Sequence, residues 1–161
     1  MNGWIFIDKP KNITSFKVIQ RLRKILNIKK IGHAGTLDPF ATGILAIAVG
    51  EATKSIHFFN QNKVYIFNVI FGESKDTDDI TGKTINKSNI IPTLEEINKA
   101  LRRFVGKHSQ VPPKYSAVKV NGKRAYKLAR NNQKFELKAK DVFIKSFECL
   151  GAKNKNEYSF R

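Results

Sequence analysis

The stretch from Gly32 to Gly43 limits the folds open to this chain more than any other segment. It holds three glycines and one Asp-Pro pair within twelve residues, and apolar segments flank it. This composition is typical of an ordered loop, and Pro39 holds the preceding Asp38 in an extended conformation. Asp-Pro pairs also occur in ordinary turns. The sequence therefore predicts one carboxylate on a stiff loop. Asp38 is either an ordinary turn residue or a nucleophile or general base.

The segments around this loop predict a helix and two strands. Residues 4–7 and 44–49 are short apolar runs, as in buried strands. Thr14 or Ser15 can cap a helix that has one apolar and one basic face. The apolar stripe consists of Val18, Ile19, Leu22, Ile25 and Leu26, and the basic face of Lys17, Arg21 and Lys24.

The C-terminal two thirds of the chain predict more strands than helices. Residues 64–71 are β-branched and aromatic, so we expect a strand covered on both faces. Further strands are expected at residues 83–86, 116–120, 141–150 and 157–160, with a tight turn at Asn121-Gly122. A capping box from Thr93 to Glu96 predicts a helix that buries Leu94, Ile97, Leu101 and Phe104. The fold class is therefore α+β, with a mixed, mostly antiparallel sheet flanked by helices.

The charge distribution indicates a polyanionic partner. Thirty basic and thirteen acidic residues give a formal net charge of +17, which attracts nucleic acid. Residues 1–37 hold eight basic side chains and one acidic, and residues 99–140 hold thirteen and one. A bias in genome composition toward Lys, Asn and Ile would also raise the charge, but it would not segregate it.

Several classes of protein do not fit the sequence. The longest apolar run, residues 44–49, is too short to cross a bilayer, and the N-terminus lacks the pattern of a signal peptide. The single cysteine, Cys149, forms no internal disulfide, and His57 and His108 lack the spacing of metal ligands. We therefore expect a cytoplasmic protein that binds neither a membrane nor a metal.

The loop and its surroundings resemble a known family. From Gly32 to Lys54 the sequence is similar to the signature of TruB-type pseudouridine synthases, which act on tRNA, and every fixed position of that signature is filled. Two further blocks resemble the same family, although Asn12 replaces its usual glycine. These blocks are Asp8-Lys9-Pro10 with Thr14-Ser15, and residues 112–119 with Gly122, Tyr126 and Ala129-Arg130.

The resemblance implies an activity. The family isomerises the T-loop uridine of tRNA to pseudouridine without metal or cofactor, and its aspartate nucleophile matches Asp38. Attack at the ribose C1′ and attack at the uracil ring both remain open. Either route requires the uridine to be flipped out of its stack. The expected partner is the T-arm of tRNA, and we expect a monomer.

The same resemblance implies roles for other residues. His33 matches a histidine that helps rearrange the T-loop, although a histidine bonded to neighbouring backbone is the alternative. Tyr65 matches a tyrosine that stacks on the flipped base, although a strand tyrosine more often belongs to a core. Lys9, Lys30 and Lys54 flank the motifs as candidate phosphate contacts, although surface lysines are usually only solvated.

Members of this family continue beyond the point that corresponds to Arg161. They carry an arginine that pairs with the catalytic aspartate, and usually a small C-terminal RNA-binding domain. We therefore interpret residues 1–161 as a partial catalytic domain without that C-terminal domain. A truncated, catalytically incomplete homologue that binds or remodels tRNA without turnover is the main alternative. A guide-RNA-dependent synthase is another, and a basic structural protein would leave the loop unexplained.

Overall fold

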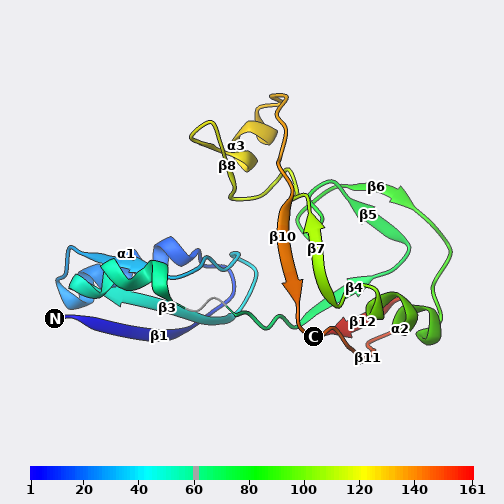
Figure 1. Cartoon of the computed structure of the whole chain (residues 1–161), viewed down its shortest axis with the longest axis horizontal. Helices are drawn as coiled ribbons and strands as arrows, with labels where there is room; N and C mark the ends of the chain where they lie inside the picture. The colour runs from blue at the N-terminus through cyan, green and yellow to red at the C-terminus, as the bar shows by residue number, and fades with distance from the viewer. Residues whose placement is uncertain (60–61) are drawn as a thin grey trace. The chain divides into compact units, whose positions relative to one another are not determined.

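The computed structural model describes residues 1–59 and 62–161, which fall into two compact units. Unit 1 is Met1–Lys63 and unit 2 is Val64–Arg161, and each is described by itself. In Figure 1 unit 1 runs from blue to cyan-green, and unit 2 runs from green to red. The assignment of the whole chain to one partial catalytic domain stays a prediction.

A three-stranded antiparallel sheet forms the base of unit 1. Its order is β1-β3-β2, with β1 at Gly3–Lys9, β2 at Ile31–His33 and β3 at Gly43–Val49. Lys9 lies opposite Gly43, and Ile31 lies opposite Val49. The prediction of both apolar strands is confirmed. The segment from residue 31 to residue 43 is not all loop, because its first residues pair with β3 as a third strand.

Helix α1, Ser15–Leu26, packs its apolar stripe against this sheet. Thr14 is the N-cap, and its hydroxyl accepts a hydrogen bond from the Lys17 amide at 3.1 Å. The resulting core consists of Ile13, Val18, Ile19, Ile31, Leu45, Ile47 and Val49. Ile25 was predicted to be buried but is exposed, because it lies at the edge of the stripe in the last turn of the helix.

A 3-10 helix, η1 at Gly50–Phe58, follows β3 directly. It comes close to β2, since a Cβ added at Gly32 would lie 3.1 Å from Ile56 Cδ1. After this helix, the ring of Phe59 stacks on Trp4 of β1 with centroids 4.7 Å apart. Residues that follow β3 thus pack back against β1 and β2 of the same unit.

Unit 2 has its core where a second three-stranded sheet meets a helix. The sheet has the order β11-β12-β4, from Cys149–Ala152, Glu157–Phe160 and Phe67–Ile70. Helix α2, Leu94–Arg102, begins with the predicted capping box, in which Thr93 and Glu96 bond reciprocally. Ile97, Leu101 and Phe160 form the buried cluster, and Cys149 packs against it.

Three two-stranded ladders complete unit 2, and all are antiparallel. Asn121 and Gly122 have positive φ angles of 47° and 80° and form the predicted tight turn. The ladders are β5 (Glu73–Lys75) with β6 (Thr84–Lys87), β7 (Gly106–Gln110) with β10 (Lys140–Ile144), and β8 (Lys119–Val120) with β9 (Lys123–Arg124). The short helix α3, Ala125–Arg130, follows the last of these.

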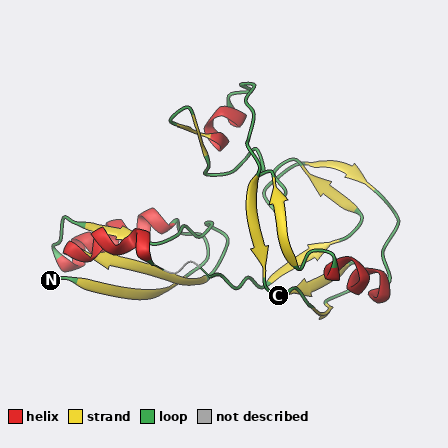
Figure 2. Cartoon of the chain, in the orientation of Figure 1, coloured by secondary structure: helices red, strands yellow, loops and turns green. Residues whose placement is uncertain are grey.

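The α+β class is confirmed, since every strand pair in the described residues is antiparallel and helices accompany the sheets (Figure 2). Several details were wrong. The predicted strand at residues 141–150 is divided between β10 and β11, which belong to different sheets, and only Lys119–Val120 of residues 116–120 forms a strand. Residues 64–66 precede β4 and are exposed, so the strand is shorter than predicted. Leu94 and Phe104 are about half exposed, because one lies at the first position of α2 and the other lies beyond its end. Among the described helices, none is long and apolar enough to span a membrane.

We predict that Ile47→Ala destabilises unit 1 by about 2–5 kcal/mol, because Ile47 is 0% exposed at the centre of its core. The matched control is Ile44→Ala in the same strand, where the side chain is 64% exposed and the cost should stay below about 1 kcal/mol. Trp4 is the only tryptophan and lies in unit 1, so its fluorescence during denaturant unfolding reports the difference. Equal losses in the two variants would contradict this description of the core.

Candidate active site

Asp38 lies on the loop that joins β2 to β3, and it is exposed. The amide of Ala34 donates to the Ala46 carbonyl at 2.9 Å, which extends the β2–β3 ladder into the loop. The amide of Ala41 donates to the Asp38 carbonyl at 3.1 Å and closes a turn. Within residues 1–59 and 62–161 the Asp38 carboxylate has no hydrogen bond or ion pair, so it is available to a ligand.

The loop is held from one side by the ammonium group of Lys9. This side chain is fully buried, and its Nζ donates to the carbonyls of Pro10 and Ile13 at 2.9 Å and of Pro39 at 3.3 Å. All three protons of the ammonium are therefore used within the protein. We correct the expectation that Lys9 contacts a phosphate: its role in this structure is to fix the carbonyl directly after Asp38.

Ser15 holds the loop at the residue before Asp38. Its hydroxyl accepts from the Leu37 amide at 3.0 Å and donates to the Leu37 carbonyl at 3.1 Å. The Ser15 side chain is buried at the first position of α1, so water does not compete for these bonds. The sequence offered Thr14 and Ser15 as alternative helix caps, and Thr14 takes that role.

A third contact comes from Asn12, whose amide donates to the Pro39 carbonyl at 2.7 Å. Asn12 has a φ of 63°, in the left-handed region that favours glycine and next favours asparagine. The replacement of the family's usual glycine is therefore compatible with the turn. Leu37 is therefore bonded to the first residue of α1, and Pro39 is bonded to Lys9 and Asn12 before that helix. Asp38 lies between these two fixed residues.

His33 ends β2, next to the same loop, and it is half buried. Its Nδ1 atom is buried, and among the described residues it finds no hydrogen-bond partner. A histidine held by neighbouring backbone through this atom would show such a bond. The arrangement thus leaves a polar atom near the loop unpaired, which is compatible with the predicted role at the substrate.

Lys30 precedes β2 and is paired with an acid. Its Nζ lies 2.7 Å from a Glu51 carboxylate oxygen, and Lys54 lies 2.6 Å from the other. The hydrogen bonds from Lys30 and Lys54 lower the pKa of Glu51. Both lysines remain at the surface, but part of their charge is already balanced, so a contact with phosphate would compete with Glu51.

Tyr65 belongs to unit 2, whereas Asp38, His33 and Lys30 belong to unit 1. It is 60% exposed and lies outside β4, so it is not the core residue that the alternative proposed. An exposed aromatic ring can stack on a base. Its role at the substrate stays a prediction.

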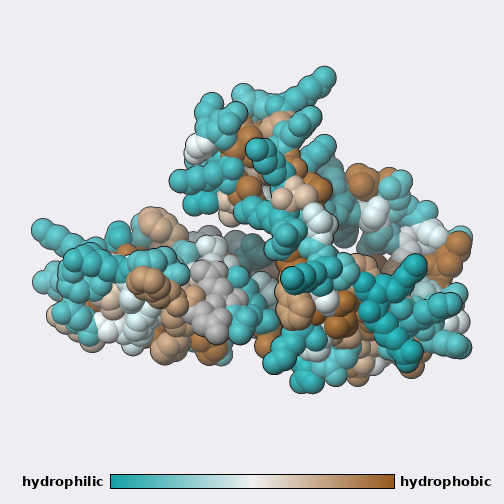
Figure 3. Space-filling model, in the orientation of Figure 1, coloured by the Kyte–Doolittle hydropathy of each residue, from teal (hydrophilic) through white to brown (hydrophobic). Residues whose placement is uncertain are grey.

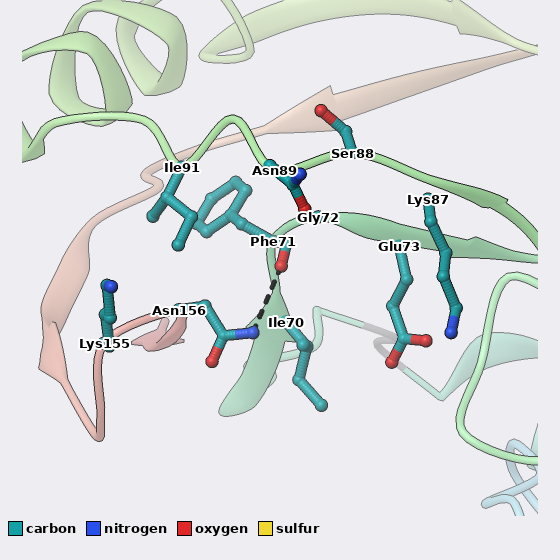
Figure 4. A pocket seen from close by; sticks show the side chains of 10 residues that line it. All are labelled: Ile70, Phe71, Gly72, Glu73, Lys87, Ser88, Asn89, Ile91, Lys155 and Asn156. Carbon is teal, nitrogen blue, oxygen red and sulfur yellow. Dashed lines mark hydrogen bonds between the residues drawn. The ribbon is translucent and has the colours of Figure 1, made fainter.

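Unit 2 also contains an open pocket of about 640 Å³ (Figure 4). An apolar part, with Ile70, Phe71 and Ile91, meets a polar rim that includes Lys87 and Lys155. No predicted site residue lines it. The described side chains also contain no group of three or more His, Cys, Asp or Glu placed to hold a metal ion. The Asp38 loop therefore stays the candidate active site.

Comparison with known proteins connects this loop to a family. A family model described as "TruB family pseudouridylate synthase (N terminal domain)" matches residues 23–161. The chain is 52% identical over 157 residues to the tRNA pseudouridine synthase B of Ehrlichia ruminantium (strain Gardel), which covers 97% of this chain and 53% of that protein. The protein of the same name from Rhodospirillum rubrum is 49% identical over 151 residues, covering 93% and 49% respectively.

The chain spans about half the length of the curated relatives that it matches. Its fold is also found in solved structures. A chain in the crystal structure of a Cbf5-Nop10-Gar1 complex superposes with a TM-score of 0.62 at 25% identity, over 98% of this chain and 38% of that one. The α+β architecture described above is thus shared with this experimentally determined chain.

We predict that Lys9→Met destabilises unit 1 by about 2–5 kcal/mol, because it leaves three carbonyls without their charged donor. Lys11→Met is the matched control, since Lys11 is exposed two residues away and should cost less than about 0.5 kcal/mol. Denaturant unfolding followed by Trp4 fluorescence measures both. A Lys9→Met chain as stable as the control would show that the buried ammonium does not hold the loop.

Proposed function

The chain belongs to the TruB family of pseudouridylate synthases, and from this premise we propose that it converts a uridine of tRNA to pseudouridine with Asp38 as nucleophile. The substrate class follows from relatives named tRNA pseudouridine synthase B. The T-loop uridine is the proposed target, because the motifs from Gly32 to Lys54 resemble those of enzymes that act there.

One observation carries the proposal. Asp38 offers an exposed carboxylate, free of partners in the described part of the chain, while the residues on both sides of it are fixed by buried groups. A nucleophile held in one position loses little entropy when it meets its target. A residue that served only the turn would not require such support on both sides.

The proposed reaction needs no external reagent. The bond between ribose C1′ and uracil N1 breaks, the freed uracil turns, and a bond forms between C1′ and uracil C5. N1 gains a proton and C5 loses one, so the reaction is redox-neutral. Asp38 can begin it by attack at C1′ or at the uracil ring, and both routes require the uridine to leave its stack.

Other residues would assist the flipped uridine. The position of His33 at the end of β2, beside the Asp38 loop, supports a contact to the rearranged loop of the RNA. The exposed ring of Tyr65 is suited to stack on the base, and Lys30 to contact a phosphate after it separates from Glu51. These roles are part of the proposal.

A second candidate function is binding of tRNA without turnover. The observation that favours it is the absence, within the described residues, of a cation in contact with the Asp38 carboxylate. In the family that this chain resembles, an arginine makes that contact. The two functions differ in whether pseudouridine appears, so one assay separates them.

We predict that the chain forms pseudouridine in an unmodified tRNA transcript, and that Asp38→Asn reduces the rate by at least about 10³-fold while tRNA affinity changes less than about threefold. The amide is nearly the same size but is a far weaker nucleophile. The measurement is product formation under single turnover, with affinity determined separately. Asp8→Asn is the matched control, since Asp8 is another exposed carboxylate of unit 1.

Normal turnover by Asp38→Asn would exclude Asp38 as the nucleophile. A wild-type chain that binds tRNA but forms no product would favour the second candidate function.

A further inference from the structure

The outer side of α1 and the turn after it carry a concentration of positive charge in unit 1. We name it the α1 basic surface and define it by five exposed cations. These are Lys17, Arg21, Arg23, Lys24 and Lys29. Lys17, Arg21 and Lys24 are spaced four and three residues apart, so they form one stripe along the helix. In Figure 3 hydrophilic side chains cover part of the visible face of unit 1.

The end of this surface is hollowed. An open pocket of about 430 Å³ is lined by Arg23, Lys24, Asn27, Ile28 and Lys29. Asn27 adopts a left-handed conformation at the C-cap, which turns the chain so that Lys29 lies on the same pocket as the last turn of the helix. Three basic residues thus line one shallow, open depression, whose volume would admit a phosphate and its sugar.

No acid balances these charges locally. Residues 9–37 contain no Asp or Glu, and none of the five cations has an ion pair in the described part of the chain. Lys30, by contrast, is paired with Glu51. The carbonyls at the C-terminus of α1 contribute only about half a negative charge, which is small beside the three cations of the pocket. The net field at the pocket is therefore positive.

The surface is not suited to a membrane. The apolar face of α1, with Val18 and Ile19, is buried in the core of unit 1. Its exposed apolar residues, Phe16 and Ile25, are nine positions apart and so point roughly half a turn away from each other. A helix that lies in a lipid interface needs a continuous apolar face, which α1 does not expose.

We propose that the α1 basic surface binds the phosphate backbone of the tRNA substrate, with Arg23, Lys24 and Lys29 holding one phosphate in the pocket. The inference rests on the proposed function for the identity of the RNA. The surface belongs to the same unit as Asp38, so contacts here would orient the RNA relative to the loop without taking part in the chemistry.

The test compares two variants that each lose three positive charges. One is Arg23→Gln/Lys24→Gln/Lys29→Gln, and the control is Lys145→Gln/Lys153→Gln/Lys155→Gln, whose lysines are exposed in unit 2. Equilibrium binding to an unmodified tRNA transcript is measured between about 50 and 200 mM salt. For the first variant the slope of log K against log salt should shrink by about 2–3, with affinity reduced roughly tenfold to hundredfold near 0.1 M.

The control should bind more tightly than the pocket variant and keep most of the slope. Lys29→Gln alone, which lies outside the helix, should reduce the slope by about 1, and thermal unfolding checks that each variant is folded. Equal effects in the two triple variants, or none in the first, would overturn the inference. So would loss of binding to anionic phosphatidylserine vesicles with tRNA binding unchanged.

Binding is measured without turnover, so the two proposals can fail separately. A chain that binds tRNA through this surface but forms no pseudouridine contradicts the proposed function and supports this inference. A chain that forms pseudouridine and binds tRNA equally well after the pocket cations are removed overturns this inference alone.

Discussion

The buried ammonium of Lys9 joins two segments that lie thirty residues apart in the chain. Its Nζ donates hydrogen bonds to the carbonyls of Pro10 and Ile13 in the turn before α1, and to the carbonyl of Pro39 in the Asp38 loop. Moving an ammonium group out of water costs several kcal/mol, and that cost is tolerable only where each proton finds an acceptor. Three carbonyls satisfy this condition at Lys9. The position of the loop therefore depends on the turn, and the turn depends on the packing of α1 against β3.

This support explains how one exposed carboxylate can be both accessible and well positioned. Ser15 fixes Leu37 through two bonds, and Lys9 and Asn12 fix Pro39, while Asp38 itself keeps its side chain outward. Loops move more than the elements that they connect, so a nucleophile on a loop needs supporting contacts of this kind. The α1 helix then has two roles: its first residue supports the site, and its last turn carries the cations proposed to bind the RNA.

Much of this arrangement can be predicted from the sequence. The apolar runs predicted β1 and β3, and the Thr93–Glu96 pair predicted the start of α2. The burial of Lys9 could also have been read from the sequence, because strand alternation places it on the same face as Ile5 and Ile7, which pack against the core. The exposure of residues 64–66 could not be predicted from the sequence. β-branched and aromatic side chains indicate a strand, but whether they are buried depends on which other segments cover them.

The central claim is that the buried contacts beside Asp38 position it for catalysis, and Ser15→Ala tests this most directly. The change removes both bonds to Leu37 and leaves the Asp38 carboxylate and the Lys9 contacts in place. The decisive measurement is the single-turnover rate of pseudouridine formation at saturating tRNA, together with the dissociation constant. We predict a rate at least about tenfold lower, with tRNA affinity within about twofold of the wild type. An unchanged rate in the folded variant would contradict the claim, because Asp38 would then be positioned without this support.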